Sequence, residues 1–136
     1  MKSEIRREIL KKRDAIGREE IAGKSSLIER NLFSAVRFIS SDVCAFYASF
    51  RSEVSTYGMI LRCIGMGKKV LLPITMKINH ELVFCVVKSL DELKPGAMGI
   101  PEPDHQHIVP YAPEDIDAMI VPGVAFDAGG YRIGYG

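Results

Sequence analysis

The last fifteen residues, 122–136, combine glycines with one arginine in a pattern typical of phosphate binding. Four glycines among the last eight residues permit positive φ and leave backbone N–H groups uncovered by side chains. Arg132 adds a guanidinium that is always charged, and it is the one basic residue among six acidic ones between positions 101 and 136. The run predicts part of an anion site. The helix N-terminus that completes many phosphate sites does not follow within the 136 residues.

A second group of cations lies at the start of the chain, where residues 1–30 hold nine of the eighteen Lys and Arg residues. At about 100° per residue, Lys2, Arg6 and Arg13 fall within about 40° of one another on a helix, beside the apolar positions. Two interpretations are open. In the first, the methylene stems of these Lys and Arg side chains cover apolar surface while their charged ends stay in water. In the second, the cluster points into the domain at an anion, chiefly through Lys2 and Arg6. With the glycine run, the second interpretation predicts a polyphosphate clamp.

Glu53 follows a short apolar segment and lies just before a predicted helix. One interpretation is that its negative charge complements the dipole of that helix. The alternative is a carboxylate at the mouth of a cleft, which accepts hydrogen bonds from a ring N–H or amino group while Phe50 packs on a flat ligand.

Other reactive residue types carry weaker signals. His105 and His107 lie between prolines without a third ligand at helical spacing, which predicts an exposed polar loop rather than a metal site. Cys44, Cys63 and Cys85 are odd in number and form no CxxC pair, so they are expected to be reduced core thiols. The absence of GxSxG, HExxH and GxxxxGK[ST] removes the main signals of serine hydrolases, zinc peptidases and classical P-loop proteins.

The composition predicts one globular domain, with 136 residues, 47% of them hydrophobic and 26% charged. A net charge of +1 argues against a nucleic-acid-binding or membrane-surface protein. The N-terminus has no apolar signal core, and no segment approaches the ~18 apolar residues that span a bilayer. Together with reduced cysteines, these features predict a cytoplasmic protein.

The elements that must position these residues follow from hydrophobic periodicity. Helices are expected over 2–16 and 18–38, and a third is expected to be capped by Ser55 and Thr56 and ended by Gly67. Continuous apolar runs predict buried parallel strands over 43–48 and 69–74, joined by that third helix. Further along the chain we expect a strand over 81–87, a helical turn over 90–93, irregular structure over 96–103 and a last strand over 117–121. Because ligands bind at the carboxyl ends of strands in open α/β sheets, the loops after Ala48, Ile74 and Val121 are the expected places for chemistry.

Five segments occur in an order and spacing that resemble the 5-formyltetrahydrofolate cyclo-ligase family, also called 5,10-methenyltetrahydrofolate synthetase. They are Lys2 with Arg6, Ser49 to Glu53 with Val54 and Thr56, the segment 67–73, the segment 99–103, and 122–127 continuing through 130–136. The last segment is the most specific, and the resemblance covers the whole chain.

The resemblance implies an α/β fold of three layers, α/β/α, with a mainly parallel sheet. It also implies an ATP-dependent ligase that closes a ring in 5-formyltetrahydrofolate, giving 5,10-methenyltetrahydrofolate, ADP and phosphate in the presence of Mg²⁺. In the mechanism accepted for the family, the formyl oxygen attacks the γ-phosphorus, and the imidate phosphate loses phosphate when the neighbouring folate nitrogen attacks. Such a reaction needs positioned charge more than a protein nucleophile.

The same resemblance assigns site residues. It implies ATP binding by Lys2, Arg6, Arg132, Ile133, Gly134, Tyr135 and Gly136, and folate binding by Ala48, Glu53 and Tyr135. Tyr135 falls where the loop can touch both ligands. No metal ligand is expected within the chain, because the family's Mg²⁺-site aspartate would lie beyond Gly136.

The family pattern continues past Gly136 with a further helix and more strands. We therefore expect residues 1–136 to form a single α/β domain that is incomplete at its C-terminus, with an exposed sheet edge. The expectation for this polypeptide alone is weak ATP binding and little or no turnover. A full-length protein is expected to be a monomer, whereas the fragment could associate through its open edge.

Two other functional classes remain open from the sequence. One is a non-catalytic module that holds a folate or a nucleotide, or that pairs with a partner through the open edge. The other is a generic Rossmann-like nucleotide protein, which the absence of GxGxxG after the first strand disfavours.

Overall fold

The computed structural model describes residues 1–76, 78–79 and 81–135. Within this part of the chain, a four-stranded sheet has the order β3-β2-β1-β6. Its strands are β1 (Val43–Ala45), β2 (Lys69–Thr75), β3 (Leu82–Val87) and β6 (Ala118–Met119). Strand β1 runs parallel to β2 and to β6, and β3 runs antiparallel to β2. The predicted mixed α/β fold with a mainly parallel sheet is confirmed.

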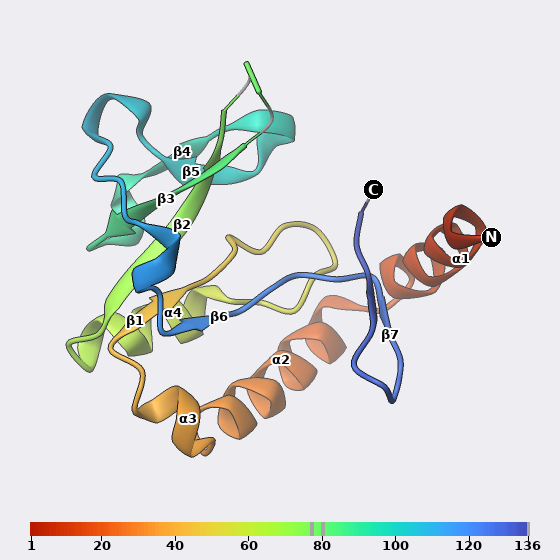
Figure 1. Cartoon of the computed structure of the whole chain (residues 1–136). Coiled ribbons are helices and arrows are strands. Elements are labelled where there is room, and N and C mark those ends of the chain that lie inside the picture. Colours follow the sequence, from red (N-terminus) through yellow and green to blue (C-terminus); the bar gives the residue numbers. More distant parts are fainter. Residues whose placement is uncertain (77, 80, 136) are drawn as a thin grey trace.

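In the described residues, four α-helices accompany the sheet: α1 (Lys2–Asp14), α2 (Arg18–Leu32), α3 (Val36–Ile39) and α4 (Tyr57–Gly65). Two hairpins lie outside it, β4 (Leu93–Pro95) with β5 (Pro101–Pro103), and β7 (Ala125–Phe126) with β8 (Arg132–Ile133). Figure 1 shows α1 and the β7–β8 hairpin projecting together from one side of the molecule, where both chain ends lie. Among the described residues, no helix is both long and apolar enough to cross a bilayer.

The core lies between one face of the sheet and α2, α3 and α4. Because Cys44 pairs with Val70 in parallel register, these side chains share a face with Phe46 and Leu72. That face packs against Phe33 and Phe38 from the α2–α3 region and Met59, Ile60 and Cys63 from α4. All three cysteines are buried and free, as predicted, and burial raises the pKa of the Cys63 thiol to about 12.

The helix predicted over 18–38 is wrong in its second half. It ends at Leu32, Ala35 is extended with φ −80° and ψ 120°, and α3 then begins at Val36. Residues five apart lie about 140° apart around a continuous helix, so Phe33 and Phe38 could not both enter the core from one. The break lets the two rings meet edge to face at 5.1 Å, with Phe38 6.3 Å from Phe46.

Several predicted strand boundaries also need correction. The strands expected over 43–48 and 117–121 are shorter, since the chain leaves the sheet after the Phe46 N–H donates to Leu71 O and the Ile120 N–H donates to Ala45 O. The segment 96–103 is not wholly irregular, because β5 pairs with β4 in a short hairpin whose ends carry the prolines. Nor is 117–121 the last strand, because β7 and β8 follow it.

Thr56 precedes α4 as predicted, but its side chain does not cap that helix. It is fully buried, and its Oγ1 donates to Tyr47 O at 2.6 Å and accepts from the Ser49 N–H at 3.1 Å. The Thr56 N–H in turn donates to Ser49 Oγ at 3.1 Å. Thr56 therefore closes the base of the loop that joins β1 to α4.

We expect Thr56→Val to lower the free energy of unfolding by about 1–3 kcal/mol, because it removes the hydrogen-bond partner of the carbonyl of Tyr47 and of the N–H of Ser49, two half-buried residues. Urea denaturation measures this change. Ser55→Ala, at an exposed position one residue earlier, should stay within about 0.5 kcal/mol of wild type. Equal losses in the two variants would contradict the role of Thr56.

Candidate functional site

The loop between β1 and α4 presents Glu53 at the carboxyl end of β1. Its Oε1 accepts a hydrogen bond from the Phe50 N–H at 2.7 Å, and its Oε2 accepts one from the Tyr135 hydroxyl at 3.1 Å. Both carboxylate oxygens thus bind groups outside α4. This geometry favours a carboxylate at a cleft over one that only complements the dipole of α4.

The glycine-rich run forms the turn of the β7–β8 hairpin. Asp127 Oδ1 accepts from the Gly129 N–H at 2.9 Å and from the Tyr131 N–H at 3.0 Å, and Gly130 has φ +86°. The Gly130 N–H donates to Asp127 O at 3.2 Å. The expectation that these glycine N–H groups are uncovered by side chains is therefore wrong for Gly129. The Gly130 N–H is also engaged within the turn, but by a backbone carbonyl.

Helix α1 meets this hairpin at Gly134. The Arg6 Nε–H donates to Gly134 O at 2.7 Å, and Arg132 Nη1 donates to Pro122 O at 2.8 Å. A Cβ atom on Gly134 would lie 3.1 Å from Arg132 Nη1. Gly134 therefore lies between two guanidinium groups that come from opposite ends of the chain.

Tyr135 links the hairpin to the Glu53 loop. The Arg13 guanidinium lies over its ring, 5.6 Å from the centroid, and the Arg13 Nε–H donates to Ser52 Oγ at 2.9 Å. The Ser52 hydroxyl donates in turn to Asp14 Oδ1. Burial raises the pKa of Tyr135 despite the hydrogen bond to Arg13, and Glu53 adds to the rise. The Tyr135 hydroxyl consequently stays protonated at neutral pH and can donate to Glu53.

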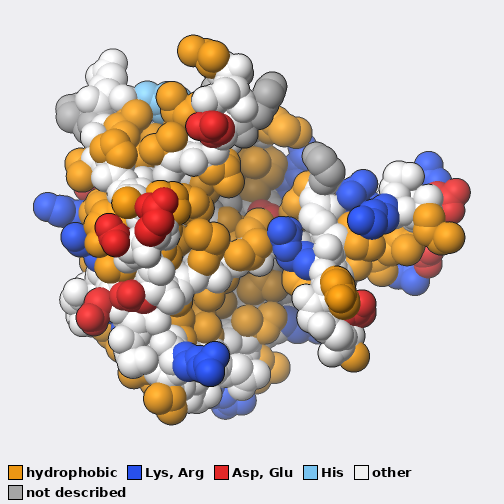
Figure 2. Space-filling view, in the orientation of Figure 1, with side chains coloured by type: hydrophobic (Ala, Val, Ile, Leu, Met, Phe, Trp, Pro, Cys, Tyr) orange, Lys and Arg blue, Asp and Glu red, His pale blue; other side chains and the backbone are white. Residues whose placement is uncertain are grey.

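A cavity of about 460 Å³ opens beside these residues. Ile21 and Ile28 of α2, Val54 and Ile120 form part of its apolar lining, and Arg13 and Glu53 are among its polar residues. Figure 2 shows hydrophobic side chains gathered where the main body meets the projecting part of the molecule. The site therefore combines an apolar hollow with a small number of charged groups, as small-molecule sites commonly do.

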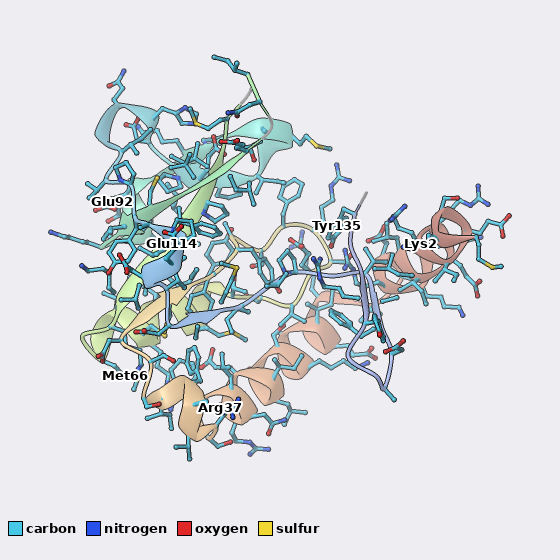
Figure 3. The ribbon with its side chains drawn as sticks, viewed as in Figure 1. Lys2, Arg37, Met66, Glu92, Glu114 and Tyr135 are labelled. Atoms are coloured by element: carbon cyan, nitrogen blue, oxygen red, sulfur yellow. The ribbon has the colours of Figure 1, made fainter. Side chains whose placement is uncertain are left out.

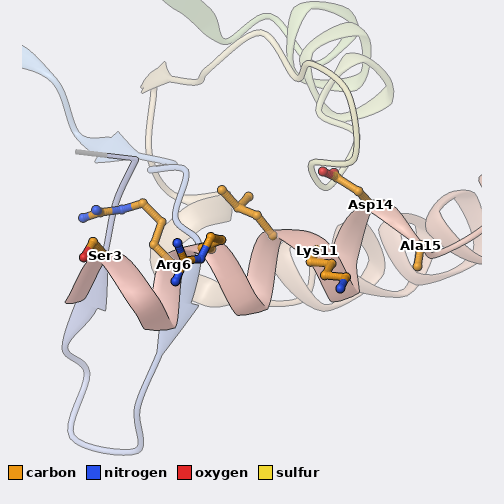
Figure 4. A pocket seen from close by; sticks show the side chains of 7 residues that line it. Ser3, Arg6, Lys11, Asp14 and Ala15 are labelled. Atoms are coloured by element: carbon orange, nitrogen blue, oxygen red, sulfur yellow. The ribbon is translucent and has the colours of Figure 1, made fainter. Parts of the chain in front are cut away.

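Unlike this cavity, the basic face of α1 is an open surface. Ser3, Arg6, Arg7, Leu10 and Lys11 line a broad open surface along the helix, which Figure 4 shows from close by. Helix α1 has no fully buried residue. Arg6 and Arg13 are half-buried and bonded to other elements, whereas Lys2 is exposed. Snorkelling alone does not describe Arg6 and Arg13, since each holds a partner from a distant part of the chain.

The structure brings together four of the residues singled out from the sequence, Arg6, Glu53, Gly134 and Tyr135. Arg132 adjoins them, Ile133 is half-buried in β8, and Ala48 is buried in the loop after β1. Figure 3 shows Lys2 at the same end of the molecule as Tyr135. Gly136 lies outside the described residues.

Arg13 and Ser52 were not assigned to the site from the sequence. Arg13 had a usable signal, because it falls in the same helical sector as Lys2 and Arg6. Ser52 had none beyond its place in the loop.

Among the described residues, no group of three or more His, Cys, Asp or Glu side chains could hold a metal ion. His105 has a specific partner that its sequence context did not predict, since its Nε2 lies 2.7 Å from Glu102 Oε1.

The model of the 5-formyltetrahydrofolate cyclo-ligase family matches residues 1–136 of the chain. The chain belongs to this family. The enzyme class implied by the sequence resemblance is thereby confirmed, an ATP-dependent ligase that cyclises 5-formyltetrahydrofolate in folate metabolism.

Two curated cyclo-ligase relatives are similar to the chain. A probable 5-formyltetrahydrofolate cyclo-ligase of Caenorhabditis elegans is 27% identical over 141 residues, which cover 100% of this chain and 68% of the relative. A 5-formyltetrahydrofolate cyclo-ligase of Haemophilus influenzae is 34% identical over 95 residues, which cover 68% of this chain and 50% of the relative.

Two solved structures share the fold of this cyclo-ligase family member. The NMR structure of Aquifex aeolicus 5,10-methenyltetrahydrofolate synthetase matches with a TM-score of 0.86 and 36% identity, over 99% of this chain and 67% of that one. A 5,10-methenyltetrahydrofolate synthetase from Mycoplasma pneumoniae matches with a TM-score of 0.76 over 99% of this chain and 71% of that one, and at 20% identity it supports the fold alone. The chain thus spans from half to 71% of the length of these four proteins.

Proposed function

We propose that the projecting part of this cyclo-ligase family member binds ATP, and that the loop carrying Glu53 binds 5-formyltetrahydrofolate. The observation that carries the proposal is the hydrogen bond from Tyr135 to Glu53, 3.1 Å long between residues 82 positions apart. It joins the hairpin to the loop, so two ligands held by these segments would lie against each other at Tyr135.

The proposed ATP side consists of residues from both ends of the chain: Lys2, Arg6, Arg132, Ile133, Gly134, Tyr135 and Gly136. Two guanidinium groups flank Gly134 in the described part of the site. A guanidinium has five N–H donors, and Arg132 uses one of them on Pro122 O. Bidentate donors of this kind suit phosphate oxygens.

We expect Arg6→Met to raise the ATP dissociation constant about tenfold, because it removes both a charge and the bond that holds Gly134. Isothermal titration calorimetry with ATP measures this. The matched control is Arg7→Met, at the exposed neighbouring position, which should change the ATP dissociation constant less than about twofold. A similar loss in both variants would mean that general charge, rather than the position of Arg6, governs binding.

The proposed folate side consists of Ala48, Glu53 and Tyr135, and of these three residues Glu53 lines the cavity of about 460 Å³. An apolar hollow suits the flat body of a folate, and a carboxylate at its edge suits the ring N–H and amino groups. A carboxylate offers about four acceptor positions, so Glu53 can bind a ligand without releasing Phe50.

The chain's own residues would contribute charge and orientation to the reaction. As the formyl oxygen forms a bond to the γ-phosphorus, the bond from that phosphorus to the bridging oxygen breaks and ADP leaves. The folate nitrogen then attacks the former formyl carbon and gives up its proton to solvent, and phosphate leaves with the oxygen. Arg6 and Arg132 would stabilise the negative charge on the transferring group, and Glu53 would orient the folate.

Further parts of the proposal concern Mg²⁺, assembly and location. Mg²⁺ would enter bound to the ATP phosphates, because protein-bound Mg²⁺ is commonly held by substrate phosphates and only a few protein ligands. Strand β6 has β1 as its one partner within the described residues, and Met119 in this strand and Val121 after it are 45% and 44% exposed. We infer a cytoplasmic monomer for a longer polypeptide and association through this edge for residues 1–136 alone.

The experiment mixes 5-formyltetrahydrofolate and Mg-ATP with purified protein and follows the methenyl absorbance. We expect little or no product from the 136-residue polypeptide and ATP-dependent product from a polypeptide extended by the following coding sequence. Folate or nucleotide binding without product in both polypeptides would instead support a non-catalytic module.

A further inference from the structure

Glu102 is a buried carboxylate that the proposed site does not use. It lies in β5 and is 8% exposed. Its Oε1 lies 2.7 Å from His105 Nε2, and its Oε2 accepts from the Thr75 N–H at 3.4 Å. Thr75 is the last residue of β2. The carboxylate thus ties the β4–β5 hairpin to the carboxyl end of a central strand.

The same side chain fills the space next to Gly96. A Cβ atom on Gly96 would overlap the carboxyl group of Glu102, so glycine is required here for the carboxylate to take up its position. Gly96 begins the turn between β4 and β5, and its N–H donates to Ile100 O at 2.9 Å. Glu102 therefore packs directly against the start of this turn.

The turn over residues 96–100 is tightly bent. The Gly99 N–H donates to Gly96 O and the Ile100 N–H donates to Ala97 O, both at 3.1 Å. Met98 and Gly99 have φ of +58° and +78°. The Met98 side chain is 84% exposed, so its packing contributes little to stabilising this backbone conformation. Contacts at the base of the turn therefore contribute more.

The turn reaches the proposed folate site through Phe50. A Cβ atom on Gly99 would lie 3.8 Å from Phe50 Cζ, which places the backbone of the turn beside the end of the ring. The Arg51 guanidinium also lies over this ring, 5.2 Å from its centroid. The Phe50 N–H donates to Glu53 Oε1. A chain of contacts therefore leads from Glu102 through Gly96 and Gly99 to Phe50 and Glu53.

We propose that Glu102 is a positioning residue that holds the 96–100 turn against Phe50 and so shapes the folate side of the site. This inference rests on the proposed function, because it takes Phe50 and Glu53 to face the folate. The contacts that lead from Glu102 do not include the guanidinium groups around Gly134. Substitution of Glu102 should therefore lower the affinity for folate and leave the affinity for ATP unchanged.

The test compares Glu102→Ala with Glu102→Gln in the full chain. Hydrogen exchange without ligand should be at least about tenfold faster at the Gly96, Gly99 and Ile100 amides in the alanine variant. Folate affinity should fall about tenfold, with ATP affinity within about twofold. The glutamine variant should stay near wild type on each measure, because its amide oxygen can accept from Thr75 and its NH₂ can donate to His105. Glu114→Ala, at an exposed position, is the surface control.

A second variant guards against simple misfolding. Gly96→Ala should displace the carboxylate and reproduce the effects of Glu102→Ala, and the double variant should be little worse than either single one. Unchanged exchange at the 96–100 turn in Glu102→Ala would overturn the proposal, and so would equal losses of folate and ATP affinity. Failure of the wild-type protein to bind folate would refute the proposed function, and the exchange data would still decide whether Glu102 holds the turn.

Discussion

Replacing Glu53 with Gln should raise the KM for 5-formyltetrahydrofolate about 10- to 100-fold and leave the KM for ATP within about twofold. The substitution keeps the size of the side chain but removes its charge and one acceptor oxygen. Hydrogen bonds to charged groups contribute about 1.5–3 kcal/mol, which corresponds to the stated range of affinity. Initial rates of methenyl formation, measured by varying one substrate at a time in a catalytically active polypeptide, give both constants.

The matched control for Glu53 is Glu114→Gln, at an exposed position that Figure 3 shows far from Tyr135. It should leave both constants unchanged. Equal increases in the two KM values for Glu53→Gln would refute its place on the folate side, because they would indicate a general disturbance of the loop.

Replacing Leu72 with Ala should destabilise the protein by about 2–5 kcal/mol, a large share of the ~5–15 kcal/mol typical of a domain. Leu72 is fully buried in β2 and belongs to the core between the sheet and the helices. The substitution leaves a cavity that neighbouring side chains fill only in part. In urea denaturation, the midpoint should fall while the slope m stays the same.

Leu61→Ala is the matched control for Leu72, because it removes the same atoms from a position in α4 that is 53% exposed. We expect a change within about 0.5 kcal/mol. A loss as large as that of Leu72→Ala would mean that the core has been assigned to the wrong faces of these elements.

The parts of the fold that the sequence predicted are those with local signals. The continuous apolar run predicted to be a strand is β2. Gly67, predicted to end the third helix, follows α4 closely and has φ of +81°. The break after Leu32 had no such signal, because the segment 18–38 keeps a helical pattern of apolar residues. The break is explained by the need to bring Phe33 against Phe38 and Phe38 against Phe46, and that need arises in the assembled core.

The candidate site shows the same difference between features with local sequence signals and features that depend on long-range contacts. The residue types of Arg6, Glu53 and Arg132 indicate charge-based chemistry from the sequence alone. Their arrangement could not be predicted, because the bonds from Arg6 to Gly134 and from Tyr135 to Glu53 span 128 and 82 positions. The Asp127 carboxylate also accepts from the Gly129 N–H, which the glycine pattern suggested was available to an anion.

The central claim is that Glu53 and Tyr135 act as one unit where the two proposed ligand sides meet. A double-mutant cycle of Glu53→Gln and Tyr135→Phe, read as the KM for 5-formyltetrahydrofolate in an active polypeptide, tests it most directly. We predict that each single change raises the KM and that the second change adds little once the first is present. Increases that multiply as for independent residues, or an unchanged KM in both single variants, would contradict the account.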